Sequence, residues 1–160
     1  MSVSYDLLER QVRELLAGES DFVANAGNFA ALLYYELPEI NWAGFYLPAP
    51  SGELLLGPFC GRPACARLPS GRGLCGAAAA ARKTLVVGDV NAFADHIICD
   101  AASRSEIVVP FFVGGTFAGV VDLDSPHVER FTENDRIGIE RLVSAFSASL
   151  REPPVVPLYG

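Results

Sequence analysis

Basic residues and long apolar runs are scarce in this sequence of 160 residues. It holds 12 Lys and Arg against 19 Asp and Glu, a formal net charge of -7, and no basic cluster exceeds two adjacent residues. Such a chain repels phosphate backbones and anionic lipid surfaces, so we expect no nucleic-acid partner. The longest apolar run, "IVVPFFV", is far shorter than the roughly 20 residues that a membrane span requires, and we expect no membrane contact.

An export signal and paired metal ligands are also missing. The N-terminus, "MSVSYDLLERQ", carries acidic residues where a signal peptide needs a basic start, so we expect a soluble cytoplasmic protein. Thiols stay reduced in that compartment, which argues against a disulfide framework. Only two histidines and four cysteines are present, without a C-x-x-C, whereas zinc sites take their ligands in tight pairs. We therefore expect no metal, and we keep a zinc-binding protein as an alternative.

Four segments have the spacing or composition of helices. Apolar residues recur at helical spacing over residues 4–17 and again after Asp21, an N-cap candidate. The alanine-rich "LCGAAAAARK" predicts a short third helix. A last helix begins at Thr132, with Asp135 as its capping-box partner, and the proline-rich tail at residues 152–160 is expected to be irregular.

The remaining patterns predict antiparallel strands. "INWAGFYL" and "ELLLGPF" flank the turn-rich "PAPSG" and indicate a hairpin. "TLVVG" is a further strand, and "SEIVVPFFV" and "TFAGVVDLD" flank Gly114-Gly115, a strong hairpin signal. Hairpins between terminal helices favour one α+β domain over residues 1–160, with its core at about residues 20–150 and its terminal helices on one face of the sheet.

Residues 89–104 have no periodicity, and long segments of this kind in compact domains are mostly functional. Cys99 lies there, within "HIICDAASRSE". Cys65 also lies in loop-like sequence, and Cys75 follows the glycine-rich "SGRG" at a predicted helix start, where the helix dipole favours a thiolate. These positions favour reactive thiols, although buried, inert thiols remain the alternative.

Two carboxylates share one face of a predicted strand. Asp122 and Asp124 alternate with Val121 and Leu123, so the two carboxylates share one face. Phe117, Val121 and Leu123 are expected to form the apolar face. A solvated acidic face is the simpler interpretation. A functional cluster needs a further acidic group from the neighbouring strand.

Glu106 begins that neighbouring strand, and the hairpin register decides which face it takes. A two-residue loop pairs residue 113 with residue 116 and turns Glu106 away from the acidic face. A three-residue loop pairs residue 112 with residue 116 and sets Glu106 opposite Asp122. Pro110 and the paired glycines make an irregular hairpin plausible, so we expect convergence with Glu106 opposite Asp122. Clustered carboxylates raise one another's pKa, so at least one of them keeps a proton near neutral pH. A thiol beside a protonated carboxyl is suited to an electrophile whose oxygen leaves as water, and a sulfoxide is such an electrophile.

Three stretches together carry a family resemblance. "GRPACARLPSGRGLCG", "HIICDAASRSEIVVP" and "GVVDLDSP" with "RFTENDR" resemble the free methionine-(R)-sulfoxide reductases, small single-domain enzymes built on a GAF fold. The resemblance covers about residues 42–135, and its most specific feature is three cysteines spaced ten and then 24 residues apart. It implies a sheet of about six strands with a loop-covered pocket on the face opposite the terminal helices.

The resemblance also implies roles for the thiols. Cys99 matches the catalytic cysteine of the family, Cys65 the principal resolving cysteine and Cys75 an auxiliary thiol. Cys99 would attack free L-methionine-(R)-sulfoxide and become a sulfenic acid, and Cys65 would then form a disulfide with it that thioredoxin reduces. No metal or organic cofactor is implied, and we expect a homodimer.

The substrate would lie among acidic and aromatic side chains. Glu106, Asp122 and Asp124 match substrate-contacting carboxylates, and Trp42 and Tyr46 resemble the aromatic wall that holds the substrate methyl group.

The sequence departs from the family pattern at three places, which are an extra thiol at Cys60, the pair Ala94-Asp95 in place of Pro-Gly, and Ile98 in place of alanine. These departures concern the shape of the loop and side reactions of the Cys60 thiol. The alternative function is a GAF module that senses a small molecule or a redox state without catalysis.

Overall fold

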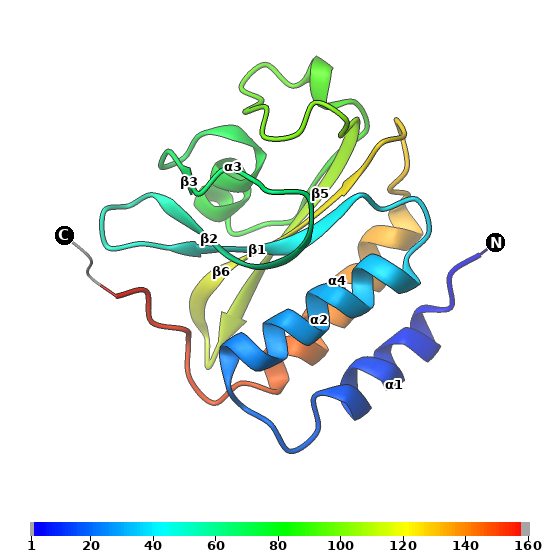
Figure 1. Ribbon diagram of the computed structural model, residues 1–160, viewed down its shortest axis with the longest axis vertical. Helices are drawn as coiled ribbons and strands as arrows, with labels where there is room; N and C mark the ends of the chain where they lie inside the picture. Colours follow the sequence, from blue (N-terminus) through cyan, green and yellow to red (C-terminus); the bar gives the residue numbers. More distant parts are fainter. Residues whose placement is uncertain (1, 158–160) are drawn as a thin grey trace.

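The computed structural model describes residues 2–157 and contains one six-stranded sheet with four α-helices (Figure 1). The strand order is β3-β2-β1-β6-β5-β4, and each neighbouring pair is antiparallel. This confirms the predicted α+β class. The elements are α1 (Tyr5–Leu15), α2 (Phe22–Glu36), β1 (Trp42–Pro48), β2 (Leu54–Gly61), β3 (Arg67–Leu68), α3 (Gly73–Ala81), β4 (Leu85–Val87), a 3-10 turn (Val90–Ala92), β5 (Ser105–Val113), β6 (Thr116–Ser125) and α4 (Glu133–Ala148).

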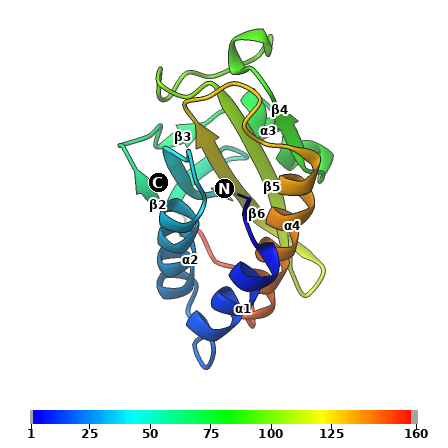
Figure 2. The same cartoon turned by 90° about the vertical axis from the view of Figure 1, so that its right-hand side faces the viewer.

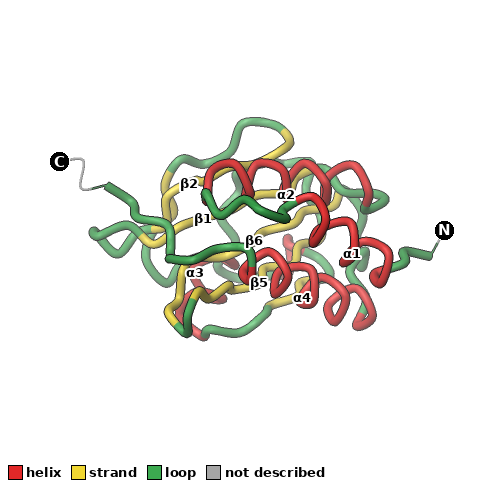
Figure 3. The backbone as a smooth tube through the Cα atoms, turned by 90° about the horizontal axis from the view of Figure 1, so that it is seen from below, coloured by secondary structure: helices red, strands yellow, loops and turns green. Residues whose placement is uncertain are grey.

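The helices divide between the two faces of the sheet. Helices α2 and α4 cover one face, with α1 outside them, whereas α3 and residues 89–104 lie over the other face (Figures 1 and 2). From below, the helices α1, α2 and α4 lie in front of the strands (Figure 3). The expected tail is irregular over residues 152–157, and its last three residues, 158–160, lie outside the described part.

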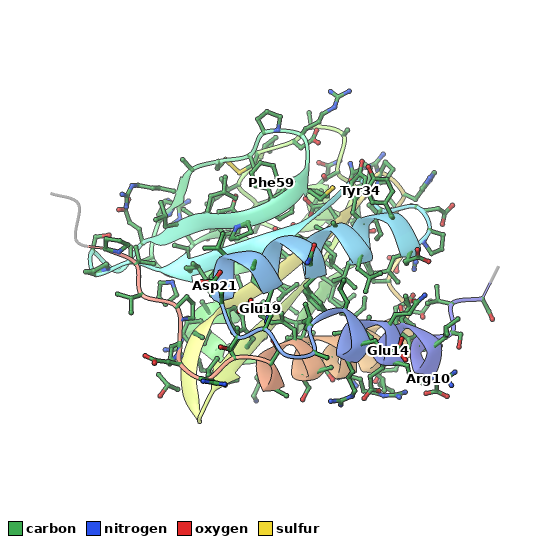
Figure 4. All side chains as sticks on the ribbon, turned by 60° about the horizontal axis from the view of Figure 1, so that its bottom comes forward. Arg10, Glu14, Glu19, Asp21, Tyr34 and Phe59 are labelled. Atoms are coloured by element: carbon green, nitrogen blue, oxygen red, sulfur yellow. A yellow bond between two sulfur atoms is a disulfide. The ribbon has the colours of Figure 1, made fainter. Side chains whose placement is uncertain are left out.

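The main core lies between the sheet and the terminal helices. The Phe146 ring of α4 lies 4.9 Å from the ring centroids of both Phe29 and Phe45, and 5.7 Å from that of Phe111. These four rings are almost fully buried, and each contributes a large share of apolar area to the stability of this layer. Charged side chains such as Arg10 and Glu14 of α1 stay exposed at the surface (Figure 4).

Side-chain caps fix the helix starts that the sequence predicts. The Asp21 side chain accepts a hydrogen bond of 2.9 Å from the Ala24 N–H at the start of α2, the helix that Figure 4 shows leading away from Asp21. Thr132 and Asp135 form a reciprocal capping box at α4. The buried Tyr5 hydroxyl donates to Asp135 at 2.6 Å, so the same carboxylate also ties α1 to α4.

The β5–β6 hairpin corrects the predicted register. Its loop has two residues, because Val113 pairs with Thr116, and both loop glycines have positive φ as the tight turn requires. A β-bulge next to Gly119 then shifts the pairing by one residue, and Glu106 lies opposite Asp124. The predicted convergence on the acidic face is correct, but its predicted cause, a three-residue loop with Asp122 opposite Glu106, is wrong.

The same bulge moves one aromatic residue to the other face. Phe117 precedes the bulge and packs in the layer that contains Val108 and Val120, not with Val121 and Leu123 as the alternation predicts. The two-residue strand β3 was also not predicted, since it lies inside a proline-rich connection and is too short for a pattern. Among residues 2–157, no helix combines the length and the hydropathy that crossing a membrane would take.

We expect Gly119→Ala to destabilise the fold by about 1–3 kcal/mol. Gly119 has φ +152°, and a Cβ there would lie 2.6 Å from the backbone oxygen of Tyr46. Urea unfolding measures the effect. The matched control is Gly27→Ala in α2, where a Cβ meets nothing within 4 Å and alanine improves helix propensity, so this control keeps or raises stability. Equal stability of the Gly119→Ala and wild-type proteins would contradict a required bulge.

Candidate active site

A cavity lies on the face of the sheet opposite α2 and α4. Strands β1, β5 and β6 form its floor, α3 forms one side, and residues 96–103 lie over it. Seven of the eight residues predicted from the sequence line it, and the eighth, Cys65, is bonded to one of them. The seven are Trp42, Tyr46, Cys75, Cys99, Glu106, Asp122 and Asp124.

A disulfide joins Cys65 to Cys99 at this cavity. Their Cα atoms are 5.4 Å apart although 34 positions separate them in the sequence. Cys65 lies between β2 and β3, and Cys99 lies in the irregular segment after the 3-10 turn. Both residues are partly exposed, and each packs against the apolar layer around the cavity. Two loops that the sequence leaves unconnected are therefore linked beside the cavity by the pair of cysteines that the resemblance implies.

The thiol of Cys75 differs from the sequence prediction. Burial is the largest cause that raises its pKa well above the ordinary value, and the charges of Asp122, Glu106 and Asp124 raise it further. The helix start therefore does not produce the expected thiolate, because desolvation and nearby carboxylates outweigh the partial charge of a nine-residue helix. Cys75 lies in the cavity as a neutral thiol.

The extra thiol, Cys60, lies away from this cavity. It pairs with Ala43, whose side chain belongs to the core under α2 and α4. Opposed residues of neighbouring strands point to the same face, so Cys60 faces the helix side of the sheet. It is free and partly buried. This placement argues against an exchange of Cys60 with the Cys65–Cys99 pair.

Three carboxyl groups meet on the floor of the cavity. Glu106 and Asp122 are 7% and 6% exposed, and Glu106 lies opposite Asp124 in the sheet. Burial is the main cause that raises the pKa of each group well above its usual range, and charge repulsion within the cluster adds to it. The cluster therefore holds protons at a pH where exposed carboxyls have lost them.

Two oxygens of this cluster have no partner among the described residues. Asp122 Oδ1 and Asp124 Oδ1 are both buried and accept no hydrogen bond. Buried polar atoms are nearly always paired, so unpaired acceptors that face a cavity indicate a site for a ligand that donates hydrogen bonds. A cationic donor fits best, because it would also offset the cost of burying negative charge.

A metal ion is a second possible occupant of the same floor. One ligand atom each from Cys75, Glu106 and Asp122 lies within 4.8 Å of the other two. Three protein ligands are fewer than the four of a structural zinc site. The sequence does not indicate this group, because its members come from three separate elements.

Trp42 and Tyr46 form one wall of the cavity. Their rings stack with centroids 6.0 Å apart, and the Phe59 ring also stacks with Trp42, at 5.4 Å. Gly44 lies between them on β1, where a Cβ would collide with Phe59 and with the Trp42 ring, so glycine makes this stack possible. Figure 4 shows Phe59 on β2, on the other side of the strands from α2.

The polar ends of this wall hold the segment that carries Cys65. The Tyr46 hydroxyl donates to the backbone oxygen of Cys65 at 2.9 Å, and Trp42 Nε1 donates to that of Arg62 at 3.1 Å. Sequence reasoning missed these bonds because it assigned both rings to the substrate alone. It also missed Ser103, a buried cavity residue that lowers the pKa of Asp124 against the larger effect of burial.

Comparisons with known proteins agree with this geometry. The GAF domain family model matches residues 26–150. A protein of Escherichia coli strain K12 named free methionine-R-sulfoxide reductase is 49% identical over 140 residues, which cover 88% of this chain and 84% of that protein.

Two solved structures are also similar to this chain. One, of fRMsr of Staphylococcus aureus in complex with substrate, has a TM-score of 0.89 and 44% identity and covers 94% of this chain and 97% of that one. Another, of free methionine-R-sulfoxide reductase from Neisseria meningitidis in complex with its substrate, has a TM-score of 0.87 and 43% identity. The match covers 93% of this chain and 92% of that one. The chain therefore belongs to the GAF-domain family of free methionine-R-sulfoxide reductases.

Proposed function

We propose that this protein reduces free L-methionine-(R)-sulfoxide to L-methionine through the Cys65–Cys99 pair. One observation carries the proposal: a disulfide lies at a cavity whose floor holds three buried carboxyl groups with raised pKa values. Redox-active sulfur and available protons are the two requirements for removing oxygen from a sulfoxide. The names and substrate complexes of the relatives support the same reaction.

The reaction begins with both cysteines reduced. The Cys99 thiolate attacks the sulfoxide sulfur while a carboxyl of the cluster gives a proton to the sulfoxide oxygen. Methionine leaves, and the oxygen stays on Cys99 as a sulfenic acid. The Cys65 thiol then attacks this sulfur, water departs, and the Cys65–Cys99 disulfide results. A dithiol such as thioredoxin returns both cysteines to thiols by exchange.

We also expect a preference for the free amino acid. The unpaired oxygens of Asp122 and Asp124 would accept hydrogen bonds from the substrate ammonium, a group that a residue within a peptide lacks. Trp42 and Tyr46 would pack against the methyl group, and backbone N–H groups near Cys99 would bind the carboxylate. Cys75 would serve as an auxiliary thiol.

The other expectations belong to the same proposal. Reducing equivalents come from thioredoxin, no metal or organic cofactor takes part, and the protein works in the cytoplasm as a homodimer. A GAF sensor without catalysis is the alternative function. The alternative includes sensing of a small molecule or of a redox state. The buried acidic floor beside a disulfide favours the enzyme, because a small-molecule sensor does not need a redox-active pair and a redox sensor does not need a cavity with buried carboxyl groups.

The direct test is incubation of the pure protein with free methionine-(R)-sulfoxide and dithiothreitol, with methionine measured by chromatography. We expect repeated turnover with the free R form. The S form and N-acetylmethionine sulfoxide serve as controls and should give little product. Failure to release methionine from the free R form would favour the sensor.

Two cysteine variants separate the roles of the thiols. Cys99→Ser should release no methionine. Cys65→Ser should release about one methionine per active site and then stop when thioredoxin is the reductant, because the sulfenic acid has no resolving thiol. Cys60→Ser, on the opposite face of the sheet, is the matched control and should keep full activity. A dimedone adduct on a cysteine other than Cys99 in the Cys65→Ser protein would mean that the nucleophile is misassigned.

Amide substitutions test the carboxyl cluster. Glu106→Gln, Asp122→Asn and Asp124→Asn should each lower turnover, by about 10²–10⁴-fold for the proton donor. Wild-type turnover should fall as the pH rises through the raised pKa of the cluster, since the donor is then ionised, and loss of the donor should remove this falling limb. Glu53→Gln at the surface is the control. Normal rates in all three cluster variants would exclude acid catalysis by the cluster.

Trp42→Phe tests the aromatic wall with a smaller change than alanine. We expect KM to rise more than kcat falls, because contact with the methyl group is shared by the ground state and the transition state. Steady-state kinetics with free methionine-(R)-sulfoxide measures both constants. A fall in kcat at constant KM would instead point to the Arg62 backbone contact and the position of the Cys65 segment.

A further inference from the structure

Asp95 joins the segment that carries Cys99 to the start of helix α3. Its Oδ1 accepts hydrogen bonds from Arg72 Nε at 3.1 Å and from Arg72 Nη2 at 2.8 Å. Its Oδ2 accepts from the backbone N–H of Gly73 at 3.0 Å. One carboxylate therefore uses both oxygens to connect two segments that are 22 and 23 positions apart in the sequence. We call these three residues the Asp95 latch.

The latch supplies an acceptor that α3 lacks. Arg72 occupies the N-cap position of this helix and makes no side-chain cap, so the first N–H group needs a partner from elsewhere. The Asp95 carboxylate provides it and places a negative charge at the positive end of the helix. Arg72 and the Gly73 N–H lower the pKa of Asp95, so the carboxylate is ionised at neutral pH.

The position of the latch connects it to the sulfur chemistry. Asp95 lies four positions before Cys99, and Gly73 lies two positions before Cys75 in the same cavity wall. Ile97 packs against Gly73, where an added Cβ would lie 3.1 Å from its side chain. Between the 3-10 turn and β5, the Cys99 segment has no strand of the sheet. The latch is therefore a polar attachment of this segment to α3, beside the apolar contact of Ile97.

We propose that Asp95 is a positioning residue that keeps Cys99 close to Cys65 when the disulfide is open. While the disulfide is closed, the covalent bond holds the two loops together. After reduction, the latch still limits the movement of the Cys99 segment, and this raises the effective concentration of one thiol at the other. The proposal rests on the redox pair of the proposed function but not on its substrate.

Equilibrium with glutathione tests the latch without any sulfoxide. In this exchange the protein disulfide and two glutathione thiols give two protein thiols and one glutathione disulfide. Mass spectrometry after alkylation counts the Cys65–Cys99 bond, and all proteins carry Cys60→Ser to prevent mixed disulfides. We expect Asp95→Ala to shift the equilibrium toward the open form by about two- to fivefold, because the open Cys99 segment then moves further from Cys65 and the effective concentration of one thiol at the other falls. The whole contribution of one helix cap sets the upper limit of this shift.

Graded variants identify the contacts that matter. Asp95→Asn keeps an acceptor for the Gly73 N–H but loses the charge, so its shift should be smaller than that of Asp95→Ala. Arg72→Ala should also give a smaller shift, because the Gly73 bond remains. Glu133→Ala is the matched control, since it breaks an exposed ion pair with Arg136 at the start of α4, on the other face of the sheet, and should leave the equilibrium unchanged.

Two measurements keep the result unambiguous. Thermal unfolding of the oxidised proteins checks that each variant is folded, and a purely structural role would lower this unfolding temperature without moving the glutathione equilibrium. An Asp95→Ala equilibrium equal to that of the parent protein would overturn the proposal. A shifted equilibrium in a protein that releases no methionine from the sulfoxide would support the latch and reject the proposed reaction.

Discussion

The site depends on three carboxyl groups buried together on one face of the sheet. Like charges in a medium of low dielectric repel strongly. The carboxyl groups of Glu106, Asp122 and Asp124 are therefore stable together only when they hold protons or when a cationic ligand binds beside them. The cost of their burial must be met by the apolar core on the opposite face, where Phe29, Phe45, Phe111 and Phe146 pack with the helices. The apolar layer under the helices therefore supplies the stability that the acidic face of the sheet requires.

The bulge at Gly119 makes this cluster geometrically possible. A regular two-residue hairpin would turn Glu106 toward the apolar core, where burial of a carboxyl without a hydrogen-bond partner would destabilise the fold. One extra residue on β6 turns it toward Asp124 instead. The backbone conformation at this point favours glycine and the space allows nothing larger, so the acidic site depends on a position that carries no functional group of its own.

The sequence predicts features that depend on neighbours along the chain. The caps at Asp21 and Thr132 follow from local chemistry, and the shared face of Asp122 and Asp124 follows from strand alternation. The bulge at Gly119 does not, because a glycine in a strand is also compatible with regular pairing. The neutral state of Cys75 was missed for a similar reason. A helix start is visible in sequence, whereas burial beside carboxylates is a tertiary property.

The resemblance to the reductase family predicted a long-range contact that local sequence patterns do not predict. Spacing alone left the pairing of Cys65 with Cys99 open, and the family pattern implied it. That pattern could not give the contacts of Asp95, which stands at a departure from it. The ion pair with Arg72 joins segments whose proximity is determined only by the complete fold.

The buried Cys75 thiol has a consequence for damage by oxidants. Peroxides react with thiolates much faster than with neutral thiols, and they must also reach the sulfur. Cys75 is only 4% exposed, and its surroundings keep the proton on sulfur. A peroxide would thus oxidise the Cys65–Cys99 pair before this third sulfur. Cys75 would stay available as an auxiliary thiol, and no irreversible sulfinic or sulfonic group would form beside the acidic floor of the cavity.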